Sequence, residues 1–472
     1  MTSHTLEPPP LAARPGPADR ARLGKAARKR VPRESHASWD PPPSRPDPVD
    51  LLASQAASRV PELVPVRYAR MLTSPFSYYR GAALPMATDL AGTPQSGITV
   101  QACGDAHLSN FGVFGTPERR LAFDVNDFDE TLPGPWEWDV KRLAASLEVA
   151  GRQNGFSQEQ RRVIVLASVR AYREAMRDFA PMGELDVWYA QTDVERLREE
   201  LDPLMGKIQR KRWDKGEAKA RTSDSAHAVK KLTEVVGDAP RFVADPPLIV
   251  PLRDLRTVDP AERQSWFADV LDGYRRSLQS DRRVLIDHYD VVDVARKVVG
   301  VGSVGTRCWI VLLTGRHSAD PLVLQIKEAQ DSVLAPYAGP SVHDNQGERV
   351  IAGQRLMQSA SDIFLGWHRV TALDGQQRDF YVRQLRDWKY SVDIDIMVPL
   401  GMELYGRTCG WTLARAHARS GDRIAIAAYL GKSDVFDQAI TEFAAAYADQ
   451  NDRDHQALAA AATSGRIQTA DG

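Results

Sequence analysis

The sequence predicts an α+β protein in which a large helix-rich part accompanies a smaller part built on an antiparallel sheet. Two observations lead to this class. Long runs place apolar residues at helical spacing, as in 139–151, 157–172 and 435–458. Shorter runs of branched apolar residues, bounded by glycine or proline, predict strands at 98–102 and 120–125, and several more between 294 and 329.

Length, composition and charge describe a globular protein. Its 472 residues, of which 43% are hydrophobic, can bury a large core in about two to three domain-sized units. The formal net charge is −1, from 61 basic and 62 acidic side chains, so no overall field attracts nucleic acid or anionic lipid. We therefore expect no nucleic-acid partner.

Cysteine usage and the lack of long apolar runs indicate where in the cell the protein is expected. Cys103, Cys308 and Cys409 are far apart and form no C-x-x-C pair, which favours neither a disulfide framework nor a zinc site. The first residues lack the apolar core of a signal peptide, and no run of about 18 apolar residues could span a membrane. We expect a cytoplasmic protein without a membrane span, and the sequence leaves its oligomeric state open.

The N-terminal region divides into a polar tail and a helical segment. Residues 1–48 are rich in proline, arginine and alanine, and this composition predicts a disordered tail because it cannot offset the entropy lost on ordering. Helical spacing follows from about 50 to 68, interrupted by Pro61 and Pro65.

Three arginines lie just before the stretch that carries the chemistry. Arg67, Arg70 and Arg80 could hold a phosphate, because guanidinium groups suit such anions. Each of them alone is more simply a surface or ion-paired arginine.

The stretch most informative about chemistry reads CGDAHLSNFG and then, about ten residues later, FDVNDFDETLPGPWEWD. One predicted strand leads into Asp105, and Asn110 follows on the same loop. The next predicted strand leads to Asp127, with Asp129 and Glu130 close behind it. Two acidic groups are therefore expected to emerge from consecutive strands.

These side chains suit phosphoryl transfer. In that reaction one Asp orients or deprotonates an acceptor hydroxyl, while an Asn and a second Asp hold Mg²⁺ on the nucleotide phosphates. Oxygen ligands are those that Mg²⁺ prefers. Asp, Asn and Gly are also common turn residues, so a lone G-D-x-x-x-x-N pattern is more often a loop than an active site. The rest of the chain must decide between these interpretations.

A predominantly helical region follows. The helix at 139–151 buries apolar positions such as Val140 and Leu147, and Ser157 with Gln160 forms a capping box for the next helix. We interpret 151–290 as a helical insertion that shapes the choice of acceptor.

A basic run lies inside this insertion. It extends from Lys207 to Arg221 and is broken by Trp213. Such a run could lie along a polyanion, but it is more often a solvated helix face. Its role stays open. The segment 245–252, DPPLIVPL, is expected to be extended and to carry no chemistry.

A glycine loop occurs late in the chain. Gly300, Gly302 and Gly305 are spaced G-x-G-x-x-G between two runs of branched residues, VARKVV and CWIVLL. Glycines there let the backbone turn tightly close to phosphates. A dinucleotide-binding fold requires a helix directly after such a loop. A strand follows instead, and this order is the kinase type, in which the loop covers ATP.

The segments after the glycine loop supply the remaining charged groups. Lys327 lies on an alternating strand, PLVLQIKEA, at the position of a lysine that pairs nucleotide phosphates. Glu348, in the helical run 343–358, is its expected partner. The strand and hinge that start at Asp379 would present backbone groups to adenine near Gln384 and Leu385.

These motifs resemble those of the protein-kinase-like superfamily, and above all its aminoglycoside- and choline-phosphotransferase branch, whose loop reads HGDxHxxN. The resemblance implies that Asp105 is the catalytic base, that Asn110 and Asp127 bind Mg²⁺, and that Asp139 anchors the catalytic loop from the following helix. The first His of the family pattern is Cys103 here, which puts the contribution of that His in doubt.

The metal-binding aspartate has a competitor in the sequence. Asp124 lies three positions before Asp127 and could take the same role. We prefer Asp127 because the twelve positions from it to Asp139 match the interval in the kinase-like family. The alternative stays open.

The order of the motifs is rotated relative to that superfamily, with the catalytic and metal loops before the glycine loop, lysine and hinge. The resemblance implies a bilobal kinase-like fold that is circularly permuted. A rotated order is compatible with the same site, because a site depends on the geometry of its residues and not on their order in the chain. The chain would divide into a tail (1–48), the catalytic- and metal-loop part of the helical lobe (49–150), the insertion (151–290), a nucleotide-binding sheet lobe (291–388) and the rest of the helical lobe (389–472). The two long motifs also resemble those of a large bacterial family of unknown function, over roughly 35 to 460.

The leading hypothesis is an ATP- and Mg²⁺-dependent phosphotransferase that acts on an unidentified hydroxyl acceptor, either a small molecule or a protein. Three alternatives remain. The same pocket could hold ATP inverted and transfer a nucleotidyl group, or it could bind a nucleotide as a regulator without chemistry. Asp105 and His107 could instead belong to a metal hydrolase, although the other histidines are scattered along the chain.

Overall fold

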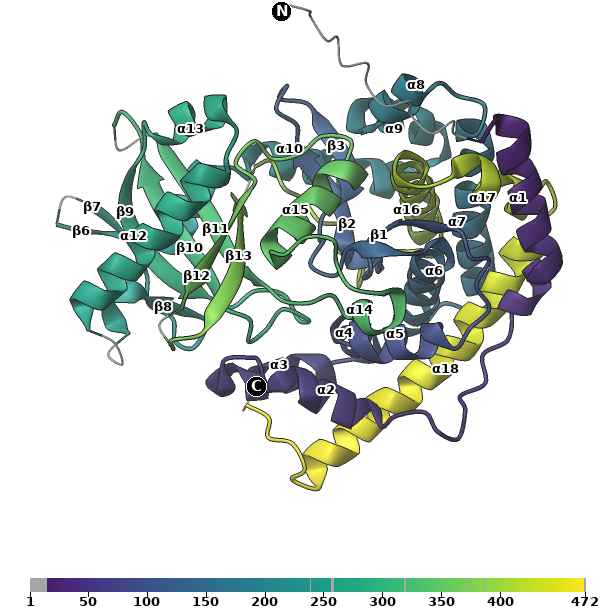
Figure 1. Ribbon diagram of the computed structural model, residues 1–472, viewed down its shortest axis with the longest axis horizontal. Coiled ribbons are helices and arrows are strands. Elements are labelled where there is room, and N and C mark those ends of the chain that lie inside the picture. The colour runs from purple at the N-terminus through teal and green to yellow at the C-terminus, as the bar shows by residue number, and fades with distance from the viewer. Residues whose placement is uncertain are drawn as a thin grey trace, which may run out of the picture.

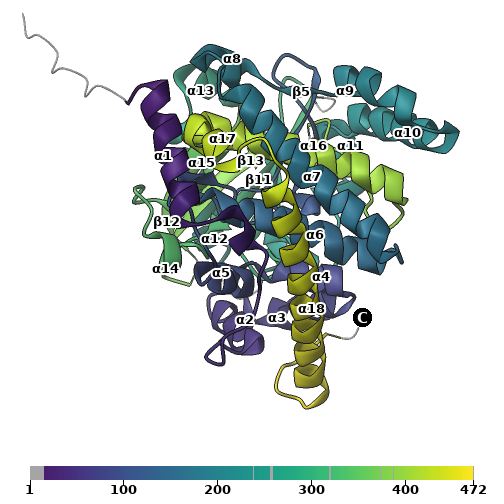
Figure 2. The same ribbon diagram turned by 90° about the vertical axis from the view of Figure 1, so that its right-hand side faces the viewer.

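The computed structural model is an α+β structure with a β-sheet at one end and a helical body at the other (Figure 1). It describes residues 15–237, 239–255, 259–317, 320–372, 374–385 and 387–470. Helices from both the N-terminal and the C-terminal parts of the chain form the helical body (Figure 2). The predicted fold class, α+β with antiparallel sheets, is confirmed at this level.

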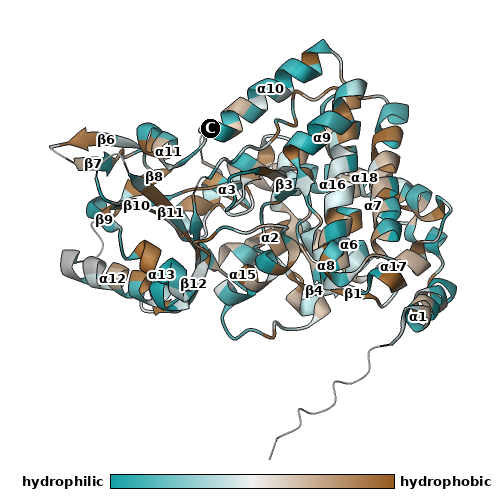
Figure 3. Ribbon diagram, turned by 90° about the horizontal axis from the view of Figure 1, so that it is seen from above, coloured by the Kyte–Doolittle hydropathy of each residue, from teal (hydrophilic) through white to brown (hydrophobic). Residues whose placement is uncertain are grey.

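The main sheet has six strands in the order β12-β13-β11-β10-β9-β8, and every neighbouring pair is antiparallel. Its strands are β8 (Ile249–Pro251), β9 (Asp290–Lys297), β10 (Cys308–Thr314), β11 (Pro321–Ala329), β12 (Gly366–Thr371) and β13 (Gln377–Gln384). The central strands β10 and β11 are almost entirely buried and are the hydrophobic centre of this end (Figure 3). Branched residues dominate them, as expected of strands covered on both faces.

Both faces of the main sheet are covered by helices. On one face, Leu324 and Ile326 of β11 pack against α12 (Pro260–Ser277) and α13 (Ser280–Ile286). On the other, Val323 of β11 packs against α11 (Ser225–Leu232) and the ribbon of β6 (Thr233–Val236) and β7 (Ala239–Phe242). The predicted alternation of side chains along β11 is confirmed.

The helical body is built around α6 (Trp136–Gln153), which is buried along almost its whole length. Around it lie α7 (Gln158–Phe179), α16 (Pro399–Ser420) and the long α18 (Val435–Thr463), which runs the length of the body (Figure 2). The predicted capping box of Ser157 and Gln160 at the start of α7 is confirmed.

Two small sheets lie between the main sheet and the helical body (Figure 1). One pairs β1 (Thr99–Ala102) with β4 (Leu132–Pro135), and the other has β2 (Phe111–Gly115), β3 (Leu121–Val125) and β5 (Thr192–Asp193). The two strands that were expected to be consecutive are thus β1 and β3, with β2 between them.

The remaining helices connect these parts. They are α2 (Pro48–Ala56), α3 (Val64–Leu72), α4 (Pro75–Gly81), α5 (Ala83–Ala91), α8 (Glu184–Tyr189), α9 (Val194–Leu201), α10 (Lys207–Thr222), α14 (Ala335–Ala338) and α15 (Gln346–Met357). Short 3-10 turns occur at Arg33–His36, Pro61–Leu63, Leu108–Asn110, Asp202–Leu204 and Leu252–Asp254.

The prediction of a disordered tail over 1–48 needs correction for residues 15–48, while 1–14 lie outside the described residues. Residues 17–30 form α1 (Pro17–Arg30), which packs against α17 (Arg423–Leu430). Gly24 of α1 allows this packing, because a Cβ there would lie 2.0 Å from the carbonyl oxygen of Ala425. The segment has few apolar side chains of its own, but it is ordered against a surface that the end of the chain supplies.

The segment 151–290 is not one insertion. Its first helix, α7, belongs to the helical body, whereas α11, β8 and α12 belong to the main sheet. Within the described residues, no helix is both long enough and apolar enough to cross a bilayer.

Candidate functional site

An open pocket of about 750 Å³, a volume that includes solvent at its mouth, lies where the helical body meets the main sheet. Residues from distant parts of the chain line it. They come from α2 to α5 (Gln55, Arg59, Arg67, Arg80, Gly81, Ala83), from the loops after β1 and β3 (Asp105, Asp127, Asp129, Glu130), from the glycine loop (Gly302, Ser303, Thr306) and from β11 and the loop after it (Glu328, Ala329, Gln330, Asp331, Val333).

The loop after β1 is held at its base by Asp139 of α6. The two carboxylate oxygens of Asp139 accept hydrogen bonds from the backbone N–H groups of Cys103, at 2.6 Å, and Gly104, at 2.9 Å. Buried His417 of α16 contacts the same carboxylate at 3.1 Å, and its other ring nitrogen lies 2.8 Å from the Tyr172 hydroxyl. Asp139 therefore makes the contact with the loop that its expected anchoring role requires.

Asp105 faces the pocket and is paired with Arg142 of α6. Arg142 donates to Asp105 Oδ1 from Nε at 2.8 Å and from Nη2 at 2.6 Å. Burial raises the pKa of Asp105, and the charge of Arg142 opposes that rise. Asp105 Oδ2 is left for other contacts, with His107 Nε2 at 3.7 Å. Sequence reasoning missed Arg142, because α6 carries several other charged residues and nothing in the sequence distinguishes this one.

Asn110 closes the same loop. Its side-chain amide donates to the backbone carbonyl oxygen of Asp105 at 2.8 Å. The backbone carbonyl of Asn110 accepts from Asn126 N at 2.8 Å, which ties the loop to the segment that carries Asp127. Within the part of the chain that the structure describes, Asn110 Oδ1 accepts no hydrogen bond. The oxygen that a cation would use is therefore uncommitted.

Asp127 lines the pocket, whereas Asp124 does not. The Asp127 side chain is 32% exposed, so it can meet a ligand from solution. Asp124 is buried, forms an ion pair with Arg415 and accepts hydrogen bonds from the backbone N–H and the hydroxyl of Ser359. These contacts leave Asp124 no free oxygen face for a metal, and they support Asp127 in that role.

The described residues contain no group of three or more His, Cys, Asp or Glu side chains that could hold a metal ion. Mg²⁺ usually takes only one or two carboxylates, with phosphate and water oxygens as its other ligands. Asn110 and Asp127 offer oxygen ligands of the kind that Mg²⁺ takes, but only Asp127 is among the residues that line the pocket.

Lys327 of β11 joins the late part of the chain to the early part. Its buried ammonium group forms an ion pair with Asp129 and lies 3.9 Å from Asp127 Oδ1. The Tyr381 hydroxyl donates to the other oxygen of Asp129 at 2.6 Å. Burial alone would lower the pKa of Lys327, but the two carboxylates raise it well above its usual value. Lys327 is therefore a cation at neutral pH.

The two aspartates beside Lys327 differ in acidity. Burial, and then the neighbouring Asp129 carboxylate, raise the pKa of Asp127. Burial would also raise the pKa of Asp129, but the charge and hydrogen bond of Lys327 lower it. Asp129 is thus the ionised partner of Lys327, a role that the sequence did not assign to it.

The prediction that Glu348 pairs with Lys327 is wrong in this structure. Glu348 lies in the first turn of α15, its side chain is 38% exposed, and it contacts His343 at 3.4 Å. The next residue, Arg349, is the one that turns inward, and it donates to the carbonyl oxygens of Asp129 and Thr131 at 2.8 and 2.6 Å. Helix α15 therefore stabilises the acidic loop through an arginine instead of supplying a carboxylate to Lys327.

The glycine loop lies between β9 and β10, as expected, and packs on the N-terminal helices. Gly300 and Gly305 have positive φ angles of 66° and 92°, which favour glycine. Arg70 donates to the Gly300 carbonyl at 2.6 Å, and Ser303 Oγ lies 3.5 Å from Asp129 Oδ2. The loop is therefore beside the acidic cluster, with Gly302 lining the pocket.

The expected adenine-binding hinge is occupied by the protein itself. The backbone N–H of Gln384 donates to Asp362 Oδ2 at 2.5 Å, and that of Leu385 donates to the Val323 carbonyl at 2.9 Å. Leu385 and Val323 also pack against α11. Neither backbone N–H is free for a base in this conformation, because each already donates to another part of the protein.

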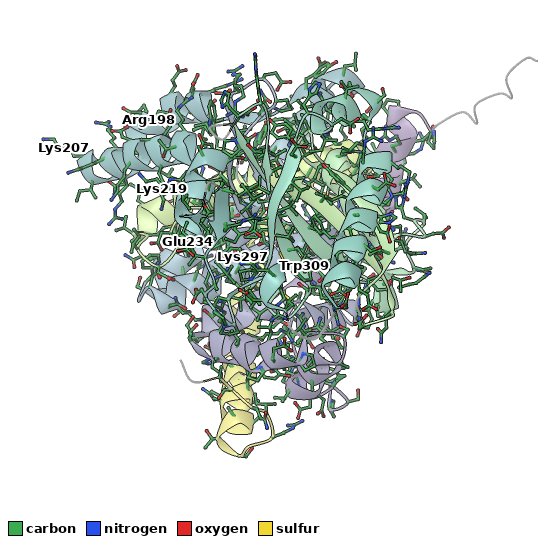
Figure 4. All side chains as sticks on the ribbon, turned by 90° about the vertical axis from the view of Figure 1, so that its left-hand side faces the viewer. Arg198, Lys207, Lys219, Glu234, Lys297 and Trp309 are labelled. Carbon is green, nitrogen blue, oxygen red and sulfur yellow. The ribbon has the colours of Figure 1, made fainter. Side chains whose placement is uncertain are left out.

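The basic run predicted within 207–221 forms α10, which lies on the surface away from the pocket. Figure 4 shows Lys207 and Lys219 on this side of the molecule, near Arg198 of α9. Arg221 pairs with Glu217 of the same helix and with Glu195 of α9. Part of the positive charge of the run is thus balanced within the protein.

The comparisons with known proteins give one match. A family model described as "Uncharacterized protein conserved in bacteria (DUF2252)" covers residues 59–461. No curated protein and no solved structure matches the chain. The matched residues include every pocket-lining residue named above except Gln55.

Proposed function

The chain belongs to this family of conserved bacterial proteins, and from the pocket we propose that it is an ATP- and Mg²⁺-dependent phosphotransferase acting on a hydroxyl acceptor. We further propose that the fold is kinase-like, with a helical lobe, a sheet lobe and circularly permuted motifs. One observation carries the proposal. The ammonium group of Lys327 lies 3.9 Å from Asp127, 200 residues earlier in the chain, and beside the glycine loop.

Each group in or beside the pocket would have a distinct task. Lys327 would bind nucleotide phosphates. On nucleotide binding it would either leave its ion pair with Asp129 or contact Asp129 and a phosphate together. Asn110 and Asp127 would hold Mg²⁺, which neutralises phosphate charge when bound. Asp105, paired with Arg142 through Oδ1, would accept the acceptor's proton on Oδ2. Positioning and charge neutralisation would then supply most of the catalysis.

The nucleotide base needs a place that this conformation does not offer at the hinge. Binding through Gln384 requires Asp362 to release its backbone N–H, and binding along β11 requires α11 to move from Val323. Nucleotide binding is therefore expected to change the exposure of α11, which hydrogen exchange can measure.

Turnover with labelled ATP tests the proposal. Purified protein with Mg²⁺, γ-labelled ATP and a panel of alcohols, sugars and proteins should transfer the γ-phosphate, and Asp105→Asn should lower transfer by at least about 10²-fold. α-labelled ATP run in parallel detects nucleotidyl transfer. Lys327→Ala should abolish the rise in melting temperature that ATP and Mg²⁺ cause in the wild type. ATP binding without any transfer would favour a nucleotide-binding regulator, and no ATP binding would end the proposal.

A further inference from the structure

Three arginines that line the pocket lack an acidic partner. Arg59 lies just after α2, Arg67 on α3 and Arg80 on α4, and no carboxylate of the described residues is within ion-pairing distance of them. Arg59 is 7% exposed and Arg67 is 1% exposed. In all three side chains the Nε atom is buried without a hydrogen-bond partner.

The contacts that these arginines do make are to neutral groups. Arg67 donates to Gln55 Oε1 at 2.9 Å and to two backbone carbonyls. Arg59 donates to the carbonyl oxygen of Val304 in the glycine loop. The Arg80 side chain makes no hydrogen bond within the described chain. None of the three charges is therefore compensated by an ion pair, although the charge of Glu130 near Arg59 and that of Asp105 near Arg80 favour the ionised guanidinium groups.

The acidic side chains of the same pocket form no ion pair with these arginines. Asp105 pairs with Arg142, Asp129 with Lys327, and Glu328 with Arg307 and Arg378, while Glu130 and Asp331 accept from Val333 N and Gln346 Nε2. The pocket thus contains three guanidinium groups that are not ion-paired with any of its acids.

Burying a charge without a counter-ion is costly, and the arginines show that cost. Burial, and then the nearby charge of Arg59, lower the pKa of Arg67 to about 9. Burial lowers the pKa of Arg59 and of Arg80 as well. An anion bound between them would remove the penalty, and planar guanidinium groups match phosphate oxygens in pairs.

The position of the cluster connects it to the rest of the site. The Arg80 carbonyl oxygen lies against Gly302, since a Cβ on that glycine would be 3.1 Å from it. Tyr79, the residue before Arg80, accepts a hydrogen bond at 2.9 Å from Arg142, which also holds Asp105. The cluster therefore lies between the glycine loop and Asp105.

We propose that Arg59, Arg67 and Arg80 form a binding site for a phosphate group, built by the N-terminal helices and separate from Lys327. The site replaces the sequence-based grouping of Arg67, Arg70 and Arg80, because Arg70 instead holds the glycine loop. Which molecule carries this phosphate rests on the proposed function. If the protein is a phosphotransferase, the phosphate is either the terminal phosphoryl group of the nucleotide or a phosphate on the acceptor.

Arg80→Gln gives the cleanest test, because this side chain makes no hydrogen bond within the described residues whose loss would unfold the protein. The matched control is Arg170→Gln, which removes the same charge from an exposed position on α7. Calorimetric titration with inorganic phosphate at constant ionic strength should give the same affinity for the wild type and Arg170→Gln. Arg80→Gln should bind at least about tenfold more weakly, in line with the loss of one charge-assisted pair.

Stability without phosphate separates binding from a structural role. Arg80→Gln should melt at or above the wild-type temperature, since the substitution removes a half-buried charge that has no ion-pair partner. A second variant, Arg59→Gln, should also lose phosphate binding. The inference is overturned if the wild type does not bind phosphate at millimolar concentration, or if Arg80→Gln and Arg59→Gln bind it as the wild type does.

A titration in the presence of ATP and Mg²⁺ identifies the source of the phosphate. Competition between ATP and phosphate assigns the site to the nucleotide, and unchanged phosphate affinity assigns it to the acceptor; both results support the site. Phosphate binding that depends on Arg80 in a protein that binds no ATP would refute the proposed function alone. ATP binding without Arg80-dependent phosphate binding would refute this inference alone.

Discussion

Replacing Lys327 with methionine should destabilise the protein, and more so at high pH. The ammonium group is 2% exposed and lies between Asp127 and Asp129, whose side chains are 32% and 25% exposed. Removing one partner of a buried ion pair costs about 3–5 kcal/mol. Because both carboxylates keep some solvent, we expect the lower part of that range, about 3 kcal/mol near pH 8. Methionine keeps most of the buried hydrocarbon, so the loss reports charge and not packing.

The pH dependence follows from the two carboxylates that Lys327 leaves behind. Without the ammonium group, their mutual repulsion and burial raise their pKa above the unfolded value, so the folded variant binds more protons than the unfolded chain. Its stability therefore falls as the pH rises from about 4 toward neutrality. A pKa shift of one unit in one carboxylate is worth about 1.4 kcal/mol. The loss of unfolding free energy relative to the wild type should therefore be smaller near pH 5.5 than near pH 8, by about 1–2 kcal/mol.

Urea denaturation followed by tryptophan fluorescence measures both effects. Wild type, Lys327→Met and the exposed-site control Lys215→Met should be unfolded at about pH 5.5 and about pH 8. Lys215→Met should match the wild type at both values, because Lys215 lies on the exposed face of α10. A loss below about 1 kcal/mol for Lys327→Met at both pH values would refute the buried pair between the two halves of the chain.

Three further perturbations test other parts of the structure. Burial raises the pKa of Glu130 from 4.5 to about 7, so the folded state binds a proton that the unfolded state has lost, and stability falls as the pH rises between these values. Glu130→Gln should therefore make the melting temperature less dependent on pH over that range. Asp139→Asn should cost about 1–3 kcal/mol in urea denaturation, because one of the N–H groups of Cys103 and Gly104 loses a charged acceptor, and equal stability would argue against the anchor. Gly24→Ala should cost about 1–3 kcal/mol, because its Cβ would meet Ala425 O at 2.0 Å, whereas Gly92→Ala, with its nearest atom at 3.6 Å, should change little.

Local chain patterns accounted for the strands and helices that carry the site. Alternation in PLVLQIKEA predicted β11 with Lys327 on the face opposite Leu324, and the two faces of the strand do belong to different clusters. The glycine spacing predicted a loop between two strands, and it lies between β9 and β10. These features depend on side-chain period and on glycine conformation, both of which are local properties.

Partner choice could not be predicted in the same way. Glu348 and Arg349 are adjacent, and which of them faces the acidic loop depends on where α15 begins and how it packs. Asp124 and Asp127 are both acidic residues near the end of one strand, and only the position of Arg415 on α16 shows that Asp124 is committed elsewhere. Contacts between residues hundreds of positions apart leave no periodic signal in the sequence.

The order of the N-terminal segment was missed for a related reason. Composition describes what a segment can bury by itself, and residues 15–48 can bury little. In the structure they are ordered by the end of the chain: Arg45 pairs with Asp454, and His36 lies 2.7 Å from the Tyr429 hydroxyl. The three arginines of the proposed phosphate site were likewise visible as residues but not as a cluster.

The sequence by itself determined the α+β class, the main strands and helices, and the set of residue types from which the pocket is made. Only the tertiary structure decided that Lys327 meets Asp129 and not Glu348, that the N–H groups of Gln384 and Leu385 are occupied, and that three arginines remain without acids. The physical reason is that backbone conformation responds to neighbours a few residues away. Charge pairing and burial depend instead on which distant surfaces come together when the chain folds.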